Sequence, residues 1–269
     1  MVMRELSGRV TIERAIDLVD KDIVFSTPNI NIVSAANRLL KSSKWRVPVV
    51  DHKKHLLGVY TAMDIVSRYY EKKTNDILVN EFMKRNVVCA FQDESLIDVV
   101  NKMRLFSISG LPVVDDDTKV IGLIEKRDII FDLPMDESMK AKDIMTEKPF
   151  YVKGVTENDS VEIIRTFVKT SFKRFPIVDG NMNVVGLLHI TAMLKNLSSV
   201  NFAWDEFIKI NAKLFVSNNY LIVHEQDPVI SIARSMKANI IDTVVVLNNE
   251  DKLAGIITES DILDKAVLI

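Results

Sequence analysis

An internal repeat of about 64 residues constrains this chain more than any other feature of its sequence. A proline at the start of an apolar strand recurs with a spacing of 64, at Pro48, Pro112 and Pro176. A glycine further along recurs with the same spacing, at Gly58, Gly122 and Gly186. A fourth copy is displaced by a few residues, with Val244 and Gly255 at these two places. The chain is therefore expected to consist of four similar units.

Each copy predicts the same order of elements. In the first copy, an apolar strand at Val47–Val50 is followed by a polar turn, a second strand at Leu56–Tyr60 and a helix at Thr61–Tyr70. An amphipathic helix precedes this group, and a short strand at Ile23–Phe25 precedes that helix. Equivalent short strands are expected at Val87–Ala90, Phe150–Val152 and Tyr220–Val223. The repeat thus predicts strand–helix–strand–strand–helix.

Copies of roughly 60 residues bury too little surface to be stable alone, so pairing is expected. We predict a mixed α/β (α+β) fold with units at residues 10–72, 73–135, 136–199 and 200–269. The first unit should pair with the second, and the third with the fourth, through their sheets and about pseudo-twofold axes. The stretch Ser198–Ile210 is expected to form a helix of its own around Trp204.

Composition excludes several classes of protein. The chain has 269 residues, 48% of them apolar, and its 35 Lys and Arg against 37 Asp and Glu give a formal net charge of -2. No broad basic field is available for nucleic acid or an acidic membrane surface. No apolar run reaches the roughly 18 residues of a spanning helix, and residues 1–10 lack a signal-peptide core. With one cysteine, Cys89, which we expect to be a buried inert thiol, a cytoplasmic location is predicted.

The pattern Gly-x-x-Thr-x-x-Asp suits a nucleotide. It occurs with Thr61 and Asp64 in the first copy and with Thr258 and Asp261 in the fourth. The glycine permits close approach to the backbone, and the threonine begins a helix whose free N–H groups favour an anion such as phosphate. A carboxylate three residues later can accept two hydrogen bonds from a ribose diol. The alternative is a helix capping box, which needs the same residues and no ligand.

The proline–valine strand, the glycine and the Thr-x-x-Asp group together resemble the cystathionine-β-synthase (CBS) domain family. The resemblance covers about residues 12–265 and identifies four tandem CBS domains in two Bateman modules. Similar proteins often bind AMP, ATP or related adenosine ligands at this place. The resemblance therefore favours nucleotide binding by at least one copy over the capping box alone.

The four copies differ at the residues that this ligand would need. The second copy keeps the diol carboxylate as Asp128 but has Glu125 where the phosphate would lie. The third copy has Ala192 in place of the carboxylate and is expected to be empty. The first and fourth copies are therefore the expected nucleotide sites, and Ser260 adds a hydroxyl at the phosphate of the fourth.

In the family, a basic residue two places before the central proline often meets the phosphate. Arg46 and Arg174 hold that place in the first and third copies. The resemblance implies that Arg174, with Lys173 beside it, faces the site built on Thr258 and Asp261. The site of the first copy would instead face an uncharged surface of the second copy. The alternative for Lys173 and Arg174 is a solvated surface pair.

These features predict a non-catalytic adenine-nucleotide sensor with AMP as the first candidate ligand and ADP or ATP behind it. No catalytic cofactor and no metal site are expected. Because the four copies fill the sequence, the output is expected to act on a partner protein in trans, and two chains could stack as a homodimer. The alternative is an interaction scaffold whose clefts are empty or hold another adenosyl ligand such as S-adenosylmethionine; an enzyme is the weakest of the three hypotheses.

Overall fold

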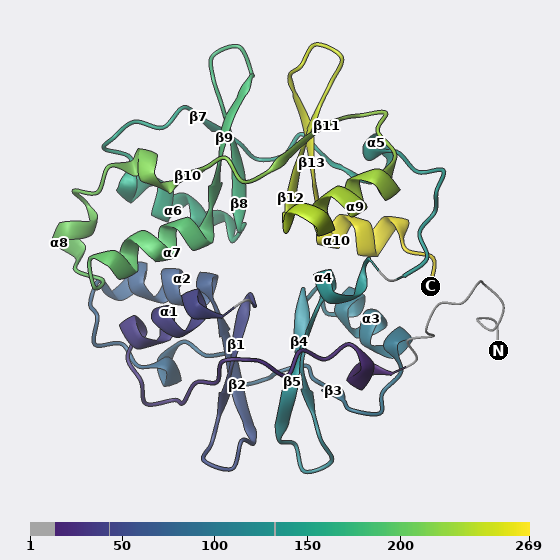
Figure 1. Cartoon of the computed structure of the whole chain (residues 1–269). Coiled ribbons are helices and arrows are strands. Elements are labelled where there is room, and N and C mark those ends of the chain that lie inside the picture. The colour runs from purple at the N-terminus through teal and green to yellow at the C-terminus, as the bar shows by residue number, and fades with distance from the viewer. Residues whose placement is uncertain (1–13, 43, 132) are drawn as a thin grey trace.

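The computed structural model describes residues 14–42, 44–131 and 133–269, and it places four α/β units around a common centre (Figure 1). This confirms the predicted fold class of four strand- and helix-containing repeats. Residues 1–10, together with the expected start of the first unit at residue 10, lie outside the described ranges. Among the described residues, no helix is both long enough and apolar enough to cross a membrane.

The first two units hold the N-terminal half of the fold. The first consists of α1 (Ile32–Lys41), β1 (Arg46–Val50), β2 (Leu56–Thr61) and α2 (Ala62–Lys72), preceded by the 3-10 turn η1 (Ala15–Asp17). The second consists of η2 (Val79–Glu81), β3 (Ala90–Phe91), α3 (Leu96–Leu105), β4 (Gly110–Val114), β5 (Val120–Glu125) and α4 (Lys126–Ile129). Helices α1 and α3 begin where the side chains of Asn31 and Ser95 accept hydrogen bonds from the first helical turn.

The last two units repeat the same order. The third consists of α5 (Ala141–Ile144), β6 (Thr146–Glu147), β7 (Val152–Lys153), α6 (Ser160–Thr170), β8 (Arg174–Val178), β9 (Val184–His189) and α7 (Ile190–Ser199). The fourth consists of α8 (Trp204–Phe207), η3 (Ala212–Phe215), β10 (Val216–Ser217), β11 (Leu221–His224), α9 (Val229–Asn239), β12 (Thr243–Leu247), β13 (Leu253–Thr258), α10 (Glu259–Asp261) and the π-helical turn η4 (Ile262–Ala266). Helix α8 is the short helix expected around Trp204.

Sheets join the units in the predicted pairs. In the first pair, Leu56 donates its backbone N–H to Thr118, and Val120 donates to Lys54. In the second pair, Leu253 donates to the carbonyl of Met182. In Figure 1 the hairpins of each pair lie side by side, β2 beside β5 and β9 beside β13. The predicted pairing of first with second and third with fourth is confirmed.

Helices join the two pairs to each other. Helices α1 and α2 of the first unit pack on α6 and α7 of the third, and one apolar core runs through both units. A second core joins the second and fourth units, with α3, α4 and α9 around it. Each unit therefore shares a sheet interface with one neighbour and a helix interface with another, so the four close a ring (Figure 1).

The repeated glycine has a structural reason that the sequence did not reveal. Strand β6, near the start of the third unit, pairs with β13 of the fourth, and β10, near the start of the fourth unit, pairs back with β9 of the third. A Cβ on Gly255 would lie 2.6 Å from Met145 Sδ, and one on Gly122 would lie 2.4 Å from the carbonyl oxygen of Asp20. Both contacts are too short, so glycine is needed where a segment from outside the unit crosses the strand.

The predicted short first strands were placed slightly too early. No strand forms at Ile23–Phe25, where only Ser26 bridges to Val49. Strands β3, β7 and β11 end one residue beyond the predicted ranges. Because each runs parallel to the later part of a central strand, the partner decides which residues pair.

Candidate functional site

The fourth unit forms the capping geometry predicted for Thr258 and Asp261. The Asp261 carboxylate accepts hydrogen bonds from the backbone N–H and the hydroxyl of Thr258, both at 2.8 Å through Oδ2. Its other oxygen, Oδ1, accepts a hydrogen bond of 3.2 Å from the Thr146 hydroxyl and lies 3.6 Å from Lys265 Nζ. The capping box therefore uses one oxygen, and the second points away from it.

A cavity of about 400 Å³ opens over these residues, and we call it the Thr258 cavity. Its wall contains all five predicted residues of the fourth-copy site: Lys173, Arg174, Thr258, Ser260 and Asp261. Two phenyl rings, Phe150 and Phe172, complete another side and lie 6.4 Å apart between ring centroids. The cavity thus combines cations, a hydroxyl, a carboxylate and aromatic surface, which is the usual lining of a small-molecule site.

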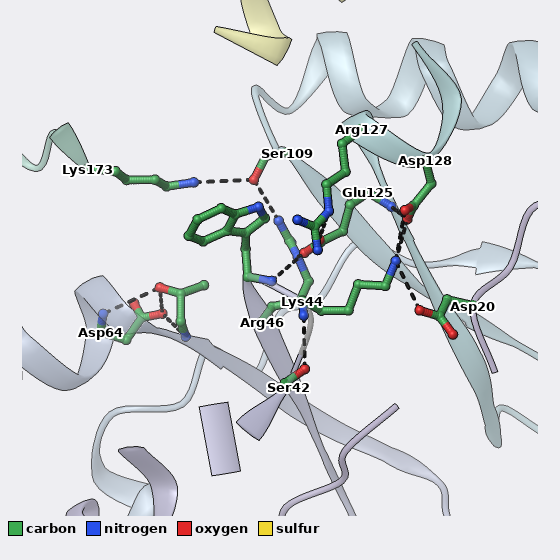
Figure 2. Close-up of polar contacts among 12 residues, drawn as sticks. Asp20, Ser42, Lys44, Arg46, Asp64, Ser109, Glu125, Arg127, Asp128 and Lys173 are labelled. Atoms are coloured by element: carbon green, nitrogen blue, oxygen red, sulfur yellow. Dashed lines mark hydrogen bonds and ion pairs between the residues drawn. The ribbon is translucent and has the colours of Figure 1, made fainter. Parts of the chain in front are cut away.

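The end of the Thr258 cavity that carries Lys173 lies toward the centre of the ring of four domains. Lys173 Nζ donates a hydrogen bond of 3.3 Å to the hydroxyl of Ser109, which belongs to the second unit (Figure 2). Burial and the positive charges of Arg46 and Arg174 lower the pKa of Lys173 to about 8. Lys173 remains mostly protonated at neutral pH, and the carboxyls of Glu125 and Glu259 partly offset its charge.

Arg174 is held by the fourth unit. It donates hydrogen bonds to the carbonyl of Asp242 at 2.6 Å and to the Thr243 hydroxyl at 2.8 Å, and it pairs with the Asp242 carboxylate at 3.3 Å. Burial opposes ionisation of Asp242, yet Arg174 and a hydrogen bond from His189 hold the pKa of that carboxyl below its ordinary value. The guanidinium is therefore fixed at the cavity wall and is not a loose surface cation.

A second cavity of about 580 Å³ lies over the third unit, and we call it the His189 cavity. Its wall includes Ala192, His189 and Asp242, with Trp45 from the first unit. Burial lowers the pKa of His189, so its ring is neutral at pH 7. This cavity lies at the copy expected to be empty. It lacks the diol carboxylate, and an acid replaces the basic residue near the phosphate position.

The first unit forms the same cap as the fourth, but a lysine holds its free oxygen. Asp64 accepts hydrogen bonds from the N–H and hydroxyl of Thr61, at 2.9 and 2.7 Å. Lys84 Nζ lies 3.2 Å from the other carboxylate oxygen. The predicted residues Thr61 and Asp64 therefore meet as expected, with a cation from the chain itself at the place of the diol.

In the second unit, a buried lysine of the chain contacts the carboxylate that was predicted to bind the ribose diol. Lys44 Nζ donates to both oxygens of Asp128 at 2.8 Å and lies 3.2 Å from Asp20 (Figure 2). Its side chain is only 4% exposed, so the ammonium fills the space beside Asp128. The structure thus places Asp128 in an ion cluster at the wall of the His189 cavity, which it also lines.

Arg46 belongs to the same ion cluster. It donates a hydrogen bond of 2.9 Å to Ser109, and its Nε lies 3.7 Å from the Glu125 carboxylate (Figure 2). Burial raises the pKa of Glu125 and lowers the pKa of Arg46, while each charge favours the ionised form of the other. Arg46 therefore lies beside the second unit, with its charge already met by Glu125.

Sequence reasoning missed the aromatic walls and one acidic residue. Phe150, Phe172 and Glu259 line the Thr258 cavity, and Trp45 lines both cavities. The sequence position of Phe172, directly before Lys173, could have indicated that it lies near the site. Phe150 lies in the segment that crosses toward the fourth unit. No repeat marked them, because the other copies carry different residues at these positions.

Metal and thiol chemistry receive no support from the described residues. In the ranges 14–42, 44–131 and 133–269, no three His, Cys, Asp or Glu side chains cluster as metal ligands. Cys89 is free and half-buried, whereas the sequence predicted a buried thiol. Burial raises the pKa of Cys89, which keeps it protonated and unreactive at neutral pH.

Comparison with known families settles the class of fold. The CBS domain family matches residues 15–71, 79–134, 141–199 and 212–267. This chain belongs to the CBS domain family. Its four CBS domains correspond to the four repeats and form the two pairs described above.

Similar proteins are known in archaea. Protein MJ1225 of Methanocaldococcus jannaschii is 27% identical over 91% of this chain and 95% of its own length. Its crystal structure superimposes with a TM-score of 0.82 at 24% identity, over 93% of this chain and 99% of that one. An uncharacterised conserved protein of Pyrococcus horikoshii has a TM-score of 0.61 at 18% identity, over 93% and 98% of the two chains. These likenesses establish the four-domain fold.

A local match also connects the chain to an enzyme. The L-aspartate semialdehyde sulfurtransferase of Methanocaldococcus jannaschii is 36% identical over 113 residues, which are 42% of this chain and 22% of the enzyme. The similarity thus spans less than half of this chain and leaves most of the enzyme unmatched.

Proposed function

We propose that this chain is a non-catalytic regulatory protein that binds an adenine nucleotide in the Thr258 cavity and signals its occupancy to a partner protein. AMP is the first candidate, with ADP and ATP behind it. The partner acts in trans, because CBS domains account for residues 15–71, 79–134, 141–199 and 212–267 and provide no separate output domain within those ranges.

One observation carries the proposal: a single cavity brings together groups suited to each part of a nucleotide. Asp261 Oδ1 lies outside the helix cap, and a ribose diol would reach it by replacing its contacts with the Thr146 hydroxyl and Lys265. Lys173 and Ser260 offer a cation and a hydroxyl for a phosphate, and Phe150 and Phe172 offer aromatic surface for a purine. These residues come from three separate stretches of the chain, and the capping of one helix does not require them to meet.

The size and charge of the cavity favour one phosphate. A volume of about 400 Å³ lies at the lower part of the range of small-molecule pockets, which is about 300–1,000 Å³. The cationic end is bounded by Trp45, Ser109 and the carboxyl of Glu259. A triphosphate would bring further negative charge against that carboxyl, so AMP should bind more tightly than ATP.

Calorimetric titration of the full chain tests the proposal with AMP, ADP, ATP, adenosine and S-adenosylmethionine. The variant Asp261→Asn should weaken AMP binding by roughly tenfold to a hundredfold, because a hydrogen bond to a charged group contributes about 1.5–3 kcal/mol. Asp116→Asn, in an exposed turn of the second unit, is the matched control and should bind AMP as the parent does. Equal AMP affinity in the parent and Asp261→Asn would reject the site and leave the capping box as the role of these residues.

The His189 cavity supports a second candidate, S-adenosylmethionine. Ala192 removes the diol carboxylate, and the wall carries three acidic residues, Asp128, Asp242 and Glu259, beside Arg127 and Lys237. A sulfonium ligand would complement such a wall better than a phosphate would. The variant Asp242→Asn should then bind S-adenosylmethionine more weakly than the parent does. The variant Asp261→Asn, titrated with AMP, tests the Thr258 cavity instead.

A further inference from the structure

Glu259 occupies a position that neither the capping geometry nor the proposed ligand contacts explain. It is the first residue of α10 and forms part of the wall of both the Thr258 cavity and the His189 cavity. Its side chain makes no hydrogen bond or ion pair with any residue of the ranges 14–42, 44–131 and 133–269. The carboxyl lies next to Ser260 at the expected phosphate position, and no donor of the described residues offsets the cost of its partial burial.

Charged groups of both signs surround Glu259 from every neighbouring element. The groups that act on its ionisation, or line a cavity with it, are the acids Asp128, Asp242, Asp261 and Glu125, the cations Arg127, Arg174, Lys173 and Lys237, and His189. Asp242 raises the cost of a negative charge on Glu259 more than any single neighbour lowers it. Arg174 and Lys173, which could offset that charge, are the same cations that a phosphate in the Thr258 cavity would use.

A phosphate and an ionised Glu259 therefore compete for the same cations. When Glu259 is ionised, a phosphate at Lys173 and Arg174 meets a like charge within the same wall. When Glu259 is protonated, the repulsion is absent and the carboxyl can donate a hydrogen bond to a phosphate oxygen. A ligand without a phosphate experiences neither effect.

We propose that Glu259 is a specificity-determining residue, which admits a phosphorylated ligand to the Thr258 cavity when it carries a proton and disfavours that ligand when it is ionised. The inference rests on the proposed nucleotide function of the same cavity. It adds that binding of the phosphate takes up a proton, so occupancy of the cavity depends on pH as well as on nucleotide concentration.

The ionisation of Glu259 supports this role. Burial, reinforced by the negative charge of Asp242, raises the pKa of Glu259 to about 7. Both forms are thus populated near neutral pH. Since the protonated form binds phosphate, the affinity for AMP falls as the pH rises through this value.

The test measures the binding of AMP and of adenosine at pH 6.5 and at pH 7.5. Both pH values lie below the pKa of Lys173 and above the second pKa of a phosphate, which is near 6. If the competent form is protonated, AMP affinity should fall about threefold across this interval, and adenosine affinity should stay constant. Titration at pH 7 in two buffers of different ionisation enthalpy should show uptake of about half a proton per AMP.

The variant Glu259→Gln keeps the size and the hydrogen-bond donor but cannot ionise. At pH 7.5 it should bind AMP about fourfold more tightly than the parent, without proton uptake. Glu250→Gln removes the same charge from an exposed turn of the fourth unit and should behave as the parent. Equal proton uptake by the parent and Glu259→Gln would overturn the role of Glu259 while leaving the nucleotide site intact. Failure of both chains to bind AMP at either pH would overturn the site and this inference together.

Discussion

The two pairs of CBS domains share one backbone plan but use their charges differently. In the first pair, Lys44 and Lys84 contact the carboxylates that follow the second strand of each hairpin, Asp128 and Asp64. In the second pair, Oδ1 of the equivalent carboxylate, Asp261, accepts a hydrogen bond from Thr146 and lies 3.6 Å from Lys265 Nζ, but this carboxylate lines an open cavity. The same capping box is thus compatible with a site filled by the chain itself and with a site open to a ligand.

The difference arises from residues outside the repeated pattern. The lysine that fills the second-unit cleft stands four places before Pro48, and the lysine beside Asp64 stands on the segment that crosses β2. In the second pair, Lys173 and Arg174 point to a cavity whose carboxylate belongs to another unit. A carboxylate in a repeat therefore indicates a ligand site only where it lines an open cavity together with groups suited to the rest of the ligand.

The largest expected effect concerns the stability of the first pair. Arg46→Ala leaves Glu125 buried, with Arg127 at 3.6 Å as its remaining ion pair. Removal of one partner of a buried pair costs about 3–5 kcal/mol of unfolding free energy, because the other charge stays out of water. Urea denaturation measures this loss, and Arg234→Ala, on the exposed face of α9, is the control.

A second substitution shows whether the loss comes from the unpaired charge. In the double variant Arg46→Met with Glu125→Leu, apolar side chains of similar size should recover most of the stability, since the uncompensated charge is gone. A loss below about 1 kcal/mol in Arg46→Ala would mean that this pair behaves as a surface ion pair. The buried ion pairs of the first pair of domains would then not account for its difference from the second pair.

Much of the fold was predictable because it repeats. The spacing of Pro48, Pro112 and Pro176 predicted the repeated units and their strands. The pairing was predicted because a single unit is too small to be stable alone and must cover its sheet with a second unit. The packing of the first unit on the third was not predicted. It depends on which helix faces match in shape, and the sequence pattern marks both faces only as apolar.

The candidate site was predicted in part. The sequence predicted that Lys173 and Arg174 face Thr258 and Asp261, and in the structure all four line one cavity. That they bind a nucleotide is a prediction. Lys44 was not foreseen as a partner of Asp128, because the reach of a long side chain across a pair interface depends on exact geometry. The repeated glycine was read as room for a ligand, whereas in the structure a crossing segment of the chain approaches it.

A smaller effect should separate phosphate recognition from ribose recognition in the second pair. Arg174→Ala removes a guanidinium from the wall of the Thr258 cavity and should weaken AMP binding by about tenfold, with little change for adenosine. The ratio of the two affinities is the measurement, because a general loss of folding stability would affect both ligands alike. Equal losses for AMP and adenosine would show that Arg174 supports the wall through Asp242 and does not attract the phosphate.

The smallest effect tests whether the first unit can be made to resemble the fourth. Lys84 is 65% exposed, so its pair with Asp64 is screened by water and contributes at most about 1 kcal/mol. Lys84→Ala removes the cation but keeps the backbone bridge between residues 59 and 84. The free oxygen of Asp64 then becomes available to a ribose diol.

In an Asp261→Asn background, where the fourth-unit site is weakened, Lys84→Ala should increase the residual AMP affinity by up to about fivefold. Lys53→Ala, in the exposed turn of the first unit, should leave it unchanged. Calorimetry with AMP and adenosine distinguishes the cause: a gain for both ligands indicates a freed diol acceptor, because both carry the ribose. No gain for either ligand would mean that Asp64 is closed by more than Lys84, and that the first pair differs from the second in the shape of its cleft as well as in its charges.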